Sequence, residues 1–338
     1  MNKYKIVQMV CWMVVFFVLV GLVIWVAFRG EFNFTTSGSY HIKDLGGPYE
    51  EVGSYNVNEE DLDSLNIHWI AGGITITTYD GNNIKLIEYA QRDLEVDEVL
   101  IYNLNGQTLQ IKYCEKNTKV FDTIPMKKLE VFVPESIASN LDDFRLNNVS
   151  AKIEINDISA NYFEVDTVSG SADVSNVNAD EIEFDSTSGS IRLNEAKTSK
   201  ATFNSASGKI SINGFTTEEL TVDTISGSVD IEDAITQELT LESVSGGIRF
   251  DGEYDDLNAE STSGSVNIID KKAPNSFDIK TISGTVNLTL PSMEDFNLKH
   301  KTVSGKFTCD IPVRSNGSGS TDYSISTTSG SIKIKELQ

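Results

Sequence analysis

Nine Ser-Gly pairs recur through the second half of the chain at a nearly constant interval. Successive glycines of these pairs lie 19, 19, 19, 19, 18, 20, 21 and 25 residues apart. A fixed period of this size is typical of repeat architectures, in which each unit is stable only when it is stacked on its neighbours. The spacing therefore predicts a repeat fold before any single residue is considered. The glycines are Gly170, Gly189, Gly208, Gly227, Gly246, Gly264, Gly284, Gly305 and Gly330.

Apolar and polar residues alternate on both sides of each glycine. Leu220 and Val222 precede Gly227, and Val229 and Ile231 follow it, with polar residues between them. A period of two with one apolar face is the pattern of half-buried β-strands. We therefore expect an all-β, single-domain parallel β-solenoid with about 19 residues and two short strands per coil. Glycine suits the corner between the strands because it adopts positive φ without a Cβ clash.

Small hydroxyl residues stand three positions before every one of these glycines. They continue the inward alternation, so we expect buried columns of hydroxyl groups along the corners. A buried hydroxyl needs a hydrogen-bond partner, and we expect the equivalent residue one coil away, about 4.8 Å distant, to supply it. The residues are Thr167, Ser186, Ser205, Thr224, Ser243, Ser261, Thr281, Thr302 and Thr327.

Weaker coils precede the glycine series. Ala151 lies one repeat period before the first of these glycines, and an earlier coil is expected around positions 71–76. Between these two coils, the segment 100–113 carries Asn105-Gly106 between two alternating runs. An Asn-Gly pair in this setting is a strong signal for a β-hairpin. We expect this hairpin at the end of the stack that comes first in the chain.

The chain begins with a long apolar segment. Residues 6–28 are almost wholly apolar, and at about 1.5 Å per residue they exceed the roughly 30 Å hydrocarbon core of a bilayer. Lys3 and Lys5 precede this segment, so the positive-inside rule places the N-terminus in the cytoplasm. The expected organisation is a cytoplasmic N-terminus (residues 1–5), a transmembrane signal anchor (6–28), an extracytoplasmic linker (29–60) and the β-solenoid domain (61–338).

This organisation predicts a single-pass protein of the cell membrane whose C-terminal domain is extracytoplasmic. A cleaved signal peptide is one alternative, although the apolar run is long for one and no small-residue cleavage site follows it. A lipoprotein attached through Cys11 is another, but the residues around Cys11 do not form a convincing lipobox. Part of the linker is alternatively an irregular cap on the first coil.

The charge balance excludes several classes of partner. The chain has 27 Lys and Arg against 50 Asp and Glu, and three of the basic residues lie in residues 1–30, which leaves 24 − 50 = −26 for the remainder. Such a charge disfavours nucleic acid and anionic lipid as partners. It fits either solubility at a cation-rich envelope or attraction for cationic molecules.

Catalytic signatures are absent from the sequence. The three histidines, His41, His68 and His300, lie in unrelated contexts, and His300 falls in an inward position where we expect it to be a core residue. Cys309 takes an inward position as well, far along the stack from Cys114. No nucleophile elbow, zinc-protease motif or P-loop is present. We therefore expect a protein that is not an enzyme and has no organic cofactor.

One outward column of residues is acidic. It lies four positions before the glycines, and stacked like charges of this kind repel one another. The column is either a solvated face that discourages edge-to-edge association or a site for a basic ligand or for divalent cations, with hard oxygen donors suited to Ca²⁺. The candidate metal ligands are Asp166, Asp185, Asp223, Glu242 and Glu260.

Three motifs carry a resemblance to a known family. The coils repeat T-x-S-G-x-I/V-x-I, residues 65–81 read L-N-I-H-W-I-A-G-G-I-T-I-T-T-Y-D-G, and residues 128–134 read K-L-E-V-F-V-P. With these motifs the chain resembles the bacterial putative-adhesin domain family over residues 60–338. The resemblance implies a bacterial cell-envelope protein, and it supplies no catalytic residues because none is established for the family.

Together, the resemblance and the charge favour a membrane-tethered, non-enzymatic cell-surface module, either an adhesin or an envelope-ligand-binding protein. Its ligand would be cell wall, a cationic peptide or an envelope protein. The alternative is an accessory or sensor protein of the cell-envelope stress response that acts through a membrane partner. This alternative follows from the resemblance, because some members of the family are encoded with envelope-stress regulators.

Overall fold

The structure is a computed structural model of the 338-residue chain. The chain divides into two compact units, residues 1–42 with 116–124 and residues 43–115 with 125–338. Short strands β1 (His41–Lys43) and β8 (Thr123–Pro125) form a sheet of their own. The residues that the structure describes are 41–58, 62–115, 123–293, 297–312 and 323–337.

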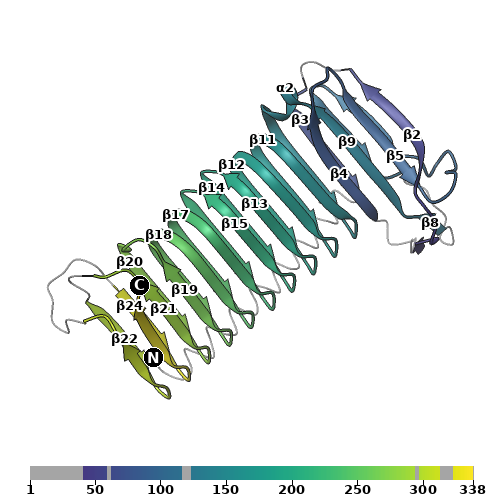
Figure 1. Cartoon of the computed structure of the whole chain (residues 1–338). Coiled ribbons are helices and arrows are strands. Elements are labelled where there is room, and N and C mark those ends of the chain that lie inside the picture. Colours follow the sequence, from purple (N-terminus) through teal and green to yellow (C-terminus); the bar gives the residue numbers. More distant parts are fainter. Residues whose placement is uncertain (1–40, 59–61, 116–122, 294–296, 313–322, 338) are drawn as a thin grey trace. The chain divides into compact units, whose positions relative to one another are not determined.

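The second unit is a stack of β-coils held together by parallel strand pairing (Figure 1). Its central strands are β10 (Leu141–Asn148), β11 (Lys152–Thr167), β12 (Ala172–Ser186), β13 (Ile191–Lys197), β14 (Lys200–Ser205), β15 (Ile210–Thr216), β16 (Glu219–Thr224), β17 (Val229–Ser243), β18 (Ile248–Ser261), β19 (Val266–Asp270), β20 (Ser276–Thr281) and β21 (Val286–Leu290). Each pairs with the strand one repeat away, so that Phe184 lies beside Phe203 and Val222 beside Leu241. In β11, β12, β17 and β18, the two expected short strands are one continuous strand of 14 to 16 residues.

Side chains alternate between the core and the surface in the register that the sequence predicts. Ile231 is completely buried, whereas the side chain of its neighbour Asp230 is 29% exposed. The core contains a column of phenylalanine rings whose successive centroids lie 4.7, 5.9 and 5.2 Å apart, which are favourable distances for aromatic pairs. The rings belong to Phe144, Phe163, Phe184 and Phe203.

The corner glycines are required by close backbone packing and not by positive φ. Among the described residues, the glycines with positive φ do not include any of the nine in the Ser-Gly pairs. A Cβ placed on Gly208 would lie 1.8 Å from the carbonyl oxygen of Gly189 in the neighbouring coil, and a Cβ on Gly246 would lie 1.6 Å from that of Gly227. The expected reason for glycine was therefore wrong, because the constraint comes from the next coil.

Eight of the nine hydroxyl residues before the glycines are buried, as expected, but they bond within their own corner; Thr302 is half-buried and donates to the carbonyl oxygen of Gly330 in the neighbouring coil. Ser186 Oγ donates to the carbonyl oxygen of Gly189 at 2.7 Å, and Ser243 Oγ donates to that of Gly246 at 2.8 Å. This bond satisfies a carbonyl group at the point where the strand ends. The hydroxyl therefore stabilises each corner separately.

A second corner has a left-handed backbone in five successive coils. The residues involved are Asp157 (φ 61°), Asn176 (φ 55°), Glu195 (φ 53°), Gly214 (φ 65°) and Asp233 (φ 50°). They follow one another at the period of the repeat, one in each coil, and stand out of the strand pairing. Asn and Asp tolerate this conformation better than other side chains do. Because only one of the five is glycine, the sequence pattern did not reveal this corner.

Coils near the first end of the stack do not follow the order of the chain. The elements here are β2 (Glu50–Val57), β3 (Ser64–Trp69), β4 (Gly72–Tyr79), β5 (Ile84–Ala90), β6 (Ile101–Asn105), β7 (Thr108–Lys112), β9 (Lys127–Pro134) and α2 (Glu135–Ala138). The coil β3–β4 lies between the coil β7–β9 and the coil β10–β11. The expected hairpin around Asn105-Gly106 is confirmed as β6–β7. Strands β5 and β2 continue the sheet beyond β9 in antiparallel pairing.

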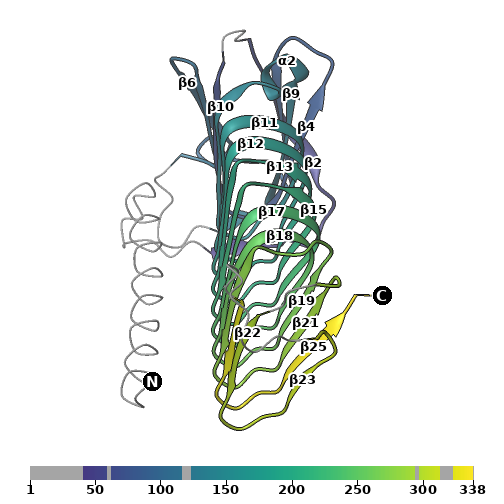
Figure 2. The ribbon, with the colours of Figure 1, turned by 90° about the vertical axis from the view of Figure 1, so that its left-hand side faces the viewer.

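The other end of the stack is also permuted. Its strands are β22 (Leu298–Thr302), β23 (Phe307–Cys309), β24 (Tyr323–Thr327) and β25 (Ile332–Glu336). The last coil of the sequence, β24–β25, lies between β20–β21 and β22–β23 (Figure 2). His300 is consequently exposed and stacks on Phe307 with centroids 3.7 Å apart, so its expected place in the core was wrong. Cys309 is half-buried.

The predicted fold class, a single-domain parallel β-solenoid with two short strands per coil behind one transmembrane helix, was wrong. The chain divides into two compact units, antiparallel strands join the parallel ones, and several coils contain one long strand. An alternating pattern such as that of residues 84–90 reads the same in either strand direction, so it could not reveal the antiparallel strands. The observed fold is an all-β sheet whose parallel strands close around a buried core, with extra antiparallel strands.

Two further predictions concern the beginning of the chain. Within the residues that the structure describes, no helix is long and apolar enough to cross a membrane. The expected anchor at residues 6–28 lies outside them. Residues 50–57, part of the segment expected as a linker, form strand β2 and pair with β5.

Candidate functional site

The candidate metal ligands lie on one outward-facing column, in the register that the sequence predicts. Neighbouring residues of the column are paired across adjacent parallel strands, so their side chains recur at about 4.8 Å. One amide, from Asn204, interrupts the carboxylates. The acidic column, as we call it, is formed by Asp166, Asp185, Asn204, Asp223, Glu242 and Glu260.

Part of the acidic column is shielded from water. Asp166, Asp185 and Asp223 each have one carboxylate oxygen that is buried without a hydrogen-bond partner. Loss of solvation is the main cause that raises the pKa of Asp166 to about 9, of Asp185 to about 6 and of Asp223 to about 7. Repulsion from Glu164 adds to the pKa increase at Asp166, and repulsion from Glu242 adds to that at Asp223. The pKa values of Asp166 and Asp223 therefore lie at or above neutral pH, far from those of freely solvated carboxyl groups.

The geometry of the acidic column does not resemble a coordination site. Across the described ranges, no group of three or more His, Cys, Asp or Glu side chains is placed to hold a metal ion. Side chains of one column point the same way, whereas Ca²⁺ requires about six to eight oxygens around one point. At one end, Lys280 Nζ lies 3.1 Å from Glu260 and 2.7 Å from Asp278. Calcium binding by the column therefore stays a prediction.

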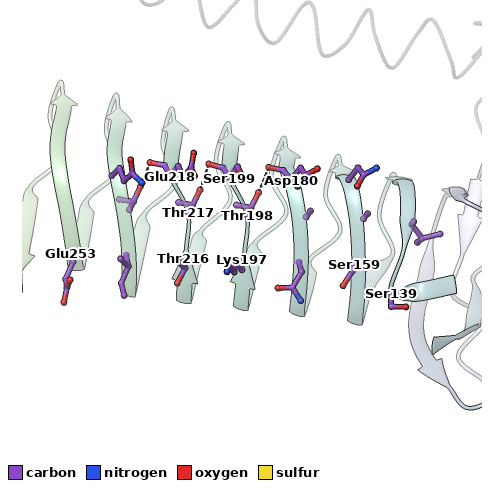
Figure 3. A pocket seen from close by; sticks show the side chains of 18 of the residues that line it. Ser139, Ser159, Asp180, Lys197, Thr198, Ser199, Thr216, Thr217, Glu218 and Glu253 are labelled. Atoms are coloured by element: carbon purple, nitrogen blue, oxygen red, sulfur yellow. Dashed lines mark hydrogen bonds between the residues drawn. The ribbon is translucent and has the colours of Figure 1, made fainter. Parts of the chain in front are cut away.

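A polar groove of about 680 Å³ crosses the coils beside the left-handed corners (Figure 3). It extends from Ser139, next to α2, to Lys272, which follows β19. The groove therefore runs along the stack and across the strands. Four acidic and two basic side chains lie among its lining residues, which are otherwise mainly Ser, Thr, Asn and Ala. The charged residues are Asp180, Lys197, Glu218, Glu253, Asp255 and Lys272.

Two rows of side chains form the walls of this groove. The first row is Ser159, Asn178, Lys197, Thr216, Ile235 and Glu253, which are neighbours in the parallel register. The second row is Asn161, Asp180, Ser199, Glu218, Gln237 and Asp255, most of them exposed. Backbone bonds of 3.1 Å link successive members of the second row, as from Ser199 N to Asp180 O and from Glu218 N to Ser199 O. Each coil thus presents one side chain from each row.

The floor between the rows is closed by buried threonines. Thr198, Thr217 and Thr236 are at most 8% exposed. The hydroxyl of Thr217 lies 3.1 Å from the carbonyl oxygen of Ser199 and 3.0 Å from that of Glu219, and the other two threonines repeat this arrangement. These hydroxyl groups are used within the coil, so a ligand would meet the two rows and not the floor.

A smaller hollow of about 290 Å³ adjoins the groove at its α2 end. Glu135 of α2 and the left-handed residues Asp157 and Asn176 line it, and Asn176 Nδ2 donates to Asp157 Oδ1. The hollow shares Ser159 and Asn178 with the groove. The left-handed corners therefore shape one edge of the polar surface.

The groove residues supply mainly hydrogen-bonding groups. Among the described residues, those that line the groove include neither histidine nor cysteine. The rows instead supply hydroxyl, amide and carboxylate groups that form hydrogen bonds. The columns around the Ser-Gly corners do not include the groove residues, so their pattern did not reveal this site. Threonines at positions 198, 217 and 236 gave the available signal, since they recur at the period of the repeat in three successive coils.

A buried ion pair near the first end of the stack is structural. Lys127 Nζ lies 2.6 Å from Glu88 Oε1, and both side chains are completely buried. Lys127 also donates to the carbonyl oxygens of Glu98 and Tyr113 and lies 4.1 Å from the centroid of the Tyr113 ring. Burial lowers the pKa of Lys127, and Glu88 opposes this effect. With these partners satisfied, the lysine has no capacity left for a ligand.

Comparison with known proteins yields structural relatives of low sequence identity. A putative adhesin from Parabacteroides distasonis ATCC 8503 is 11% identical, with 87% of this chain and 99% of that chain covered and a TM-score of 0.44. A putative lipid binding protein from the same organism is 14% identical, with 87% and 100% covered and a TM-score of 0.46. A putative adhesin from Parabacteroides merdae ATCC 43184 is 13% identical, with 89% and 100% covered and a TM-score of 0.40. No curated protein matches the sequence significantly.

The family comparison agrees with the resemblance seen in the sequence. The model of the Toastrack DUF4097 family matches residues 62–249 and 195–335. Together these matches include all the central coils, the first-end coils β3–β4 and β7–β9 and the last coil β24–β25. The chain therefore belongs to the Toastrack DUF4097 family.

Proposed function

We propose that the protein is a non-enzymatic binding module that holds an extended, polar chain of the bacterial envelope along the groove. The observation that carries the proposal is the pair of side-chain rows, which repeat with every coil over a length of several coils. A repeating surface of this kind offers the same contacts many times. Weak hydrogen bonds to a polymer then add up in one binding event.

The rigidity of the coil stack supports this proposal. Row residues project from paired strands and from backbone groups that are already hydrogen-bonded, so little order is lost when a ligand binds. The lining includes no aromatic side chain, which disfavours single-stranded nucleic acid because such sites stack bases on aromatic rings. Adhesin-like binding to the cell surface follows if the bound chain belongs to cell wall.

A co-sedimentation assay with purified bacterial cell wall tests the proposal. Ser199→Trp places a bulky ring in the exposed second row and should abolish retention of the protein on the wall. Asn213→Trp, an equally exposed change outside the groove, is the matched control and should leave retention unchanged. Retention of both variants at the wild-type level would show that the groove is not the binding site.

A further inference from the structure

The charges of the groove alternate from coil to coil. In the second row, Asp180, Glu218 and Asp255 carry carboxylates, whereas Ser199 and Gln237 between them are neutral. The first row follows the same rule, because its one acid, Glu253, belongs to the coil of Asp255. Acidic coils thus recur at every second position, which corresponds to a repeat of about 10 Å along the stack.

Neutralisation of these carboxylates is incomplete. Asp255 forms an ion pair with Lys272 at the end of the groove. Within the described residues, no Lys or Arg nitrogen lies within 4.0 Å of the carboxylates of Asp180 or Glu218. Lys197 stands in the first row of the coil between those two acids. The groove as a whole has four acids and two bases, a balance of −2.

Backbone pairing around the groove disfavours a peptide that binds by strand addition. Strands β13 and β15 each pair with a parallel neighbour on both sides, so their ladder groups are occupied. A peptide that binds by strand addition needs a free strand edge, and none lies inside the groove. Recognition must therefore use side chains alone. A pyranose unit of an extended glycan is about as long as one coil is thick, and its hydroxyl groups match the Ser, Thr, Asn and Gln side chains of the rows.

We infer that the groove binds a glycan of alternating sugar units that bears a free amino group on every second unit. Each sugar occupies one coil, and the ammonium groups lie at the coils of Asp180 and Glu218, two coils apart. The neutral coil between them, with Ser199, receives a sugar through hydrogen bonds. This inference rests on the proposed function and adds the charge and the period of the ligand.

Two hexasaccharides separate the amino-group requirement from glycan binding in general. The probes are a glucosamine hexamer that is N-acetylated on alternate units, so that every second unit keeps a free amino group, and its fully N-acetylated counterpart. The two share one backbone and differ in charge. Isothermal titration of the full chain at low ionic strength should give about tenfold tighter binding of the glucosamine hexamer, the size expected for two exposed charge pairs. The double substitution Asp180→Asn/Glu218→Gln should remove this preference, so that the affinities for the two hexamers agree within about twofold.

A matched control lies beside the groove. Glu181→Gln/Glu219→Gln also removes two carboxylates that stand two coils apart, and neither residue lines the groove. This control should keep the preference. Loss of the preference in both double variants would overturn the inference, because the net charge and not the groove would then be responsible.

The remaining outcomes distinguish the inference from the proposed function. Equal binding of the two hexamers overturns the amino-group requirement and leaves glycan binding in the groove intact. If the wild-type protein binds neither hexamer and is not retained on cell wall, the proposed function is refuted as well. A lysine hexapeptide that binds as tightly as the glucosamine hexamer would replace the glycan by a cationic peptide.

Discussion

Replacement of Asp223 by asparagine should stabilise the protein at neutral and alkaline pH. Burial raises the pKa of this carboxyl group from 3.8 to about 7, and Glu242 on the next coil adds to the increase. Asparagine has the same shape and no charge, so the substitution removes the cost of an ionised group that is partly shielded from water. The stabilisation should appear only where the wild-type carboxyl group is ionised.

The expected size follows from the pKa shift. The pKa of Asp223 rises from 3.8 to about 7, and each pH unit of this difference corresponds to about 1.4 kcal/mol, which gives an upper limit of about 4 kcal/mol for the stabilisation. The side chain is half-buried, and water reaches part of the carboxylate, so we expect about half of this value, roughly 2 kcal/mol. The sign comes from linkage. Because the folded state keeps the proton up to pH about 7 and the unfolded state loses it near 3.8, wild-type stability falls as the pH rises through this window.

Urea unfolding of wild type and Asp223→Asn at several pH values between 4 and 8.5 measures this difference. The variant should match wild type near pH 4 and exceed it by the full amount above pH 7. Asp230→Asn is the control of opposite sign, because Lys209 and Arg249 lower the pKa of Asp230, and its removal should destabilise the protein at neutral pH. A stability difference for Asp223→Asn that is negative, or that does not change with pH, would refute the reasoning.

Three other substitutions test the packing of the stack. Gly208→Ala should destabilise the protein by about 3 kcal/mol or more in urea unfolding, because the added Cβ would clash with the backbone of the neighbouring coil. Gly106→Ala is the control. Its Cβ would have no atom within 4 Å, and the φ of 63° at this position should cost only about 1–2 kcal/mol. Lys127→Met should cost about 3–5 kcal/mol because it leaves Glu88 charged and buried, and adding Glu88→Gln should recover part of the loss. Thr217→Val should lower stability by about 1 kcal/mol in the same assay, because the hydroxyl contacts two carbonyl groups; an unchanged midpoint would place this hydroxyl outside the hydrogen bonding of the floor.

The central coils could be derived from the sequence because one repeat encodes both the period and the direction of each side chain. The glycine spacing gives the register, and the alternation around residues such as Ile231 gives the buried face. The acidic column was located correctly by the same logic. The partial burial of this column could not be predicted in the same way. Solvation of a carboxylate depends on the side chains of the adjacent columns, and the spacing of one column does not report on them.

Other features left little or no trace in the pattern. The left-handed corner has Asp, Asn, Glu and Gly in turn, so no single residue type identifies it. The two permuted ends have coils with the same alternation as the others, and alternation does not encode which coil becomes the neighbour. The groove was missed for a related reason, since its rows vary in residue type from coil to coil.

The insertion of β24–β25 between two earlier coils has a consequence for the order in which the stack assembles. Within the described strands, β22 and β23 pair only with β24 and β25, which follow them in the chain. The coil β20–β21 precedes β22–β23 in the chain and has the same alternation of side chains. It therefore offers β22–β23 a competing partner, with the coils stacked in the order of the sequence. That premature pairing would have to separate before the later coil could enter. Completion of this end therefore waits for residues 323–336, and removing them would leave β22–β23 without its native neighbour.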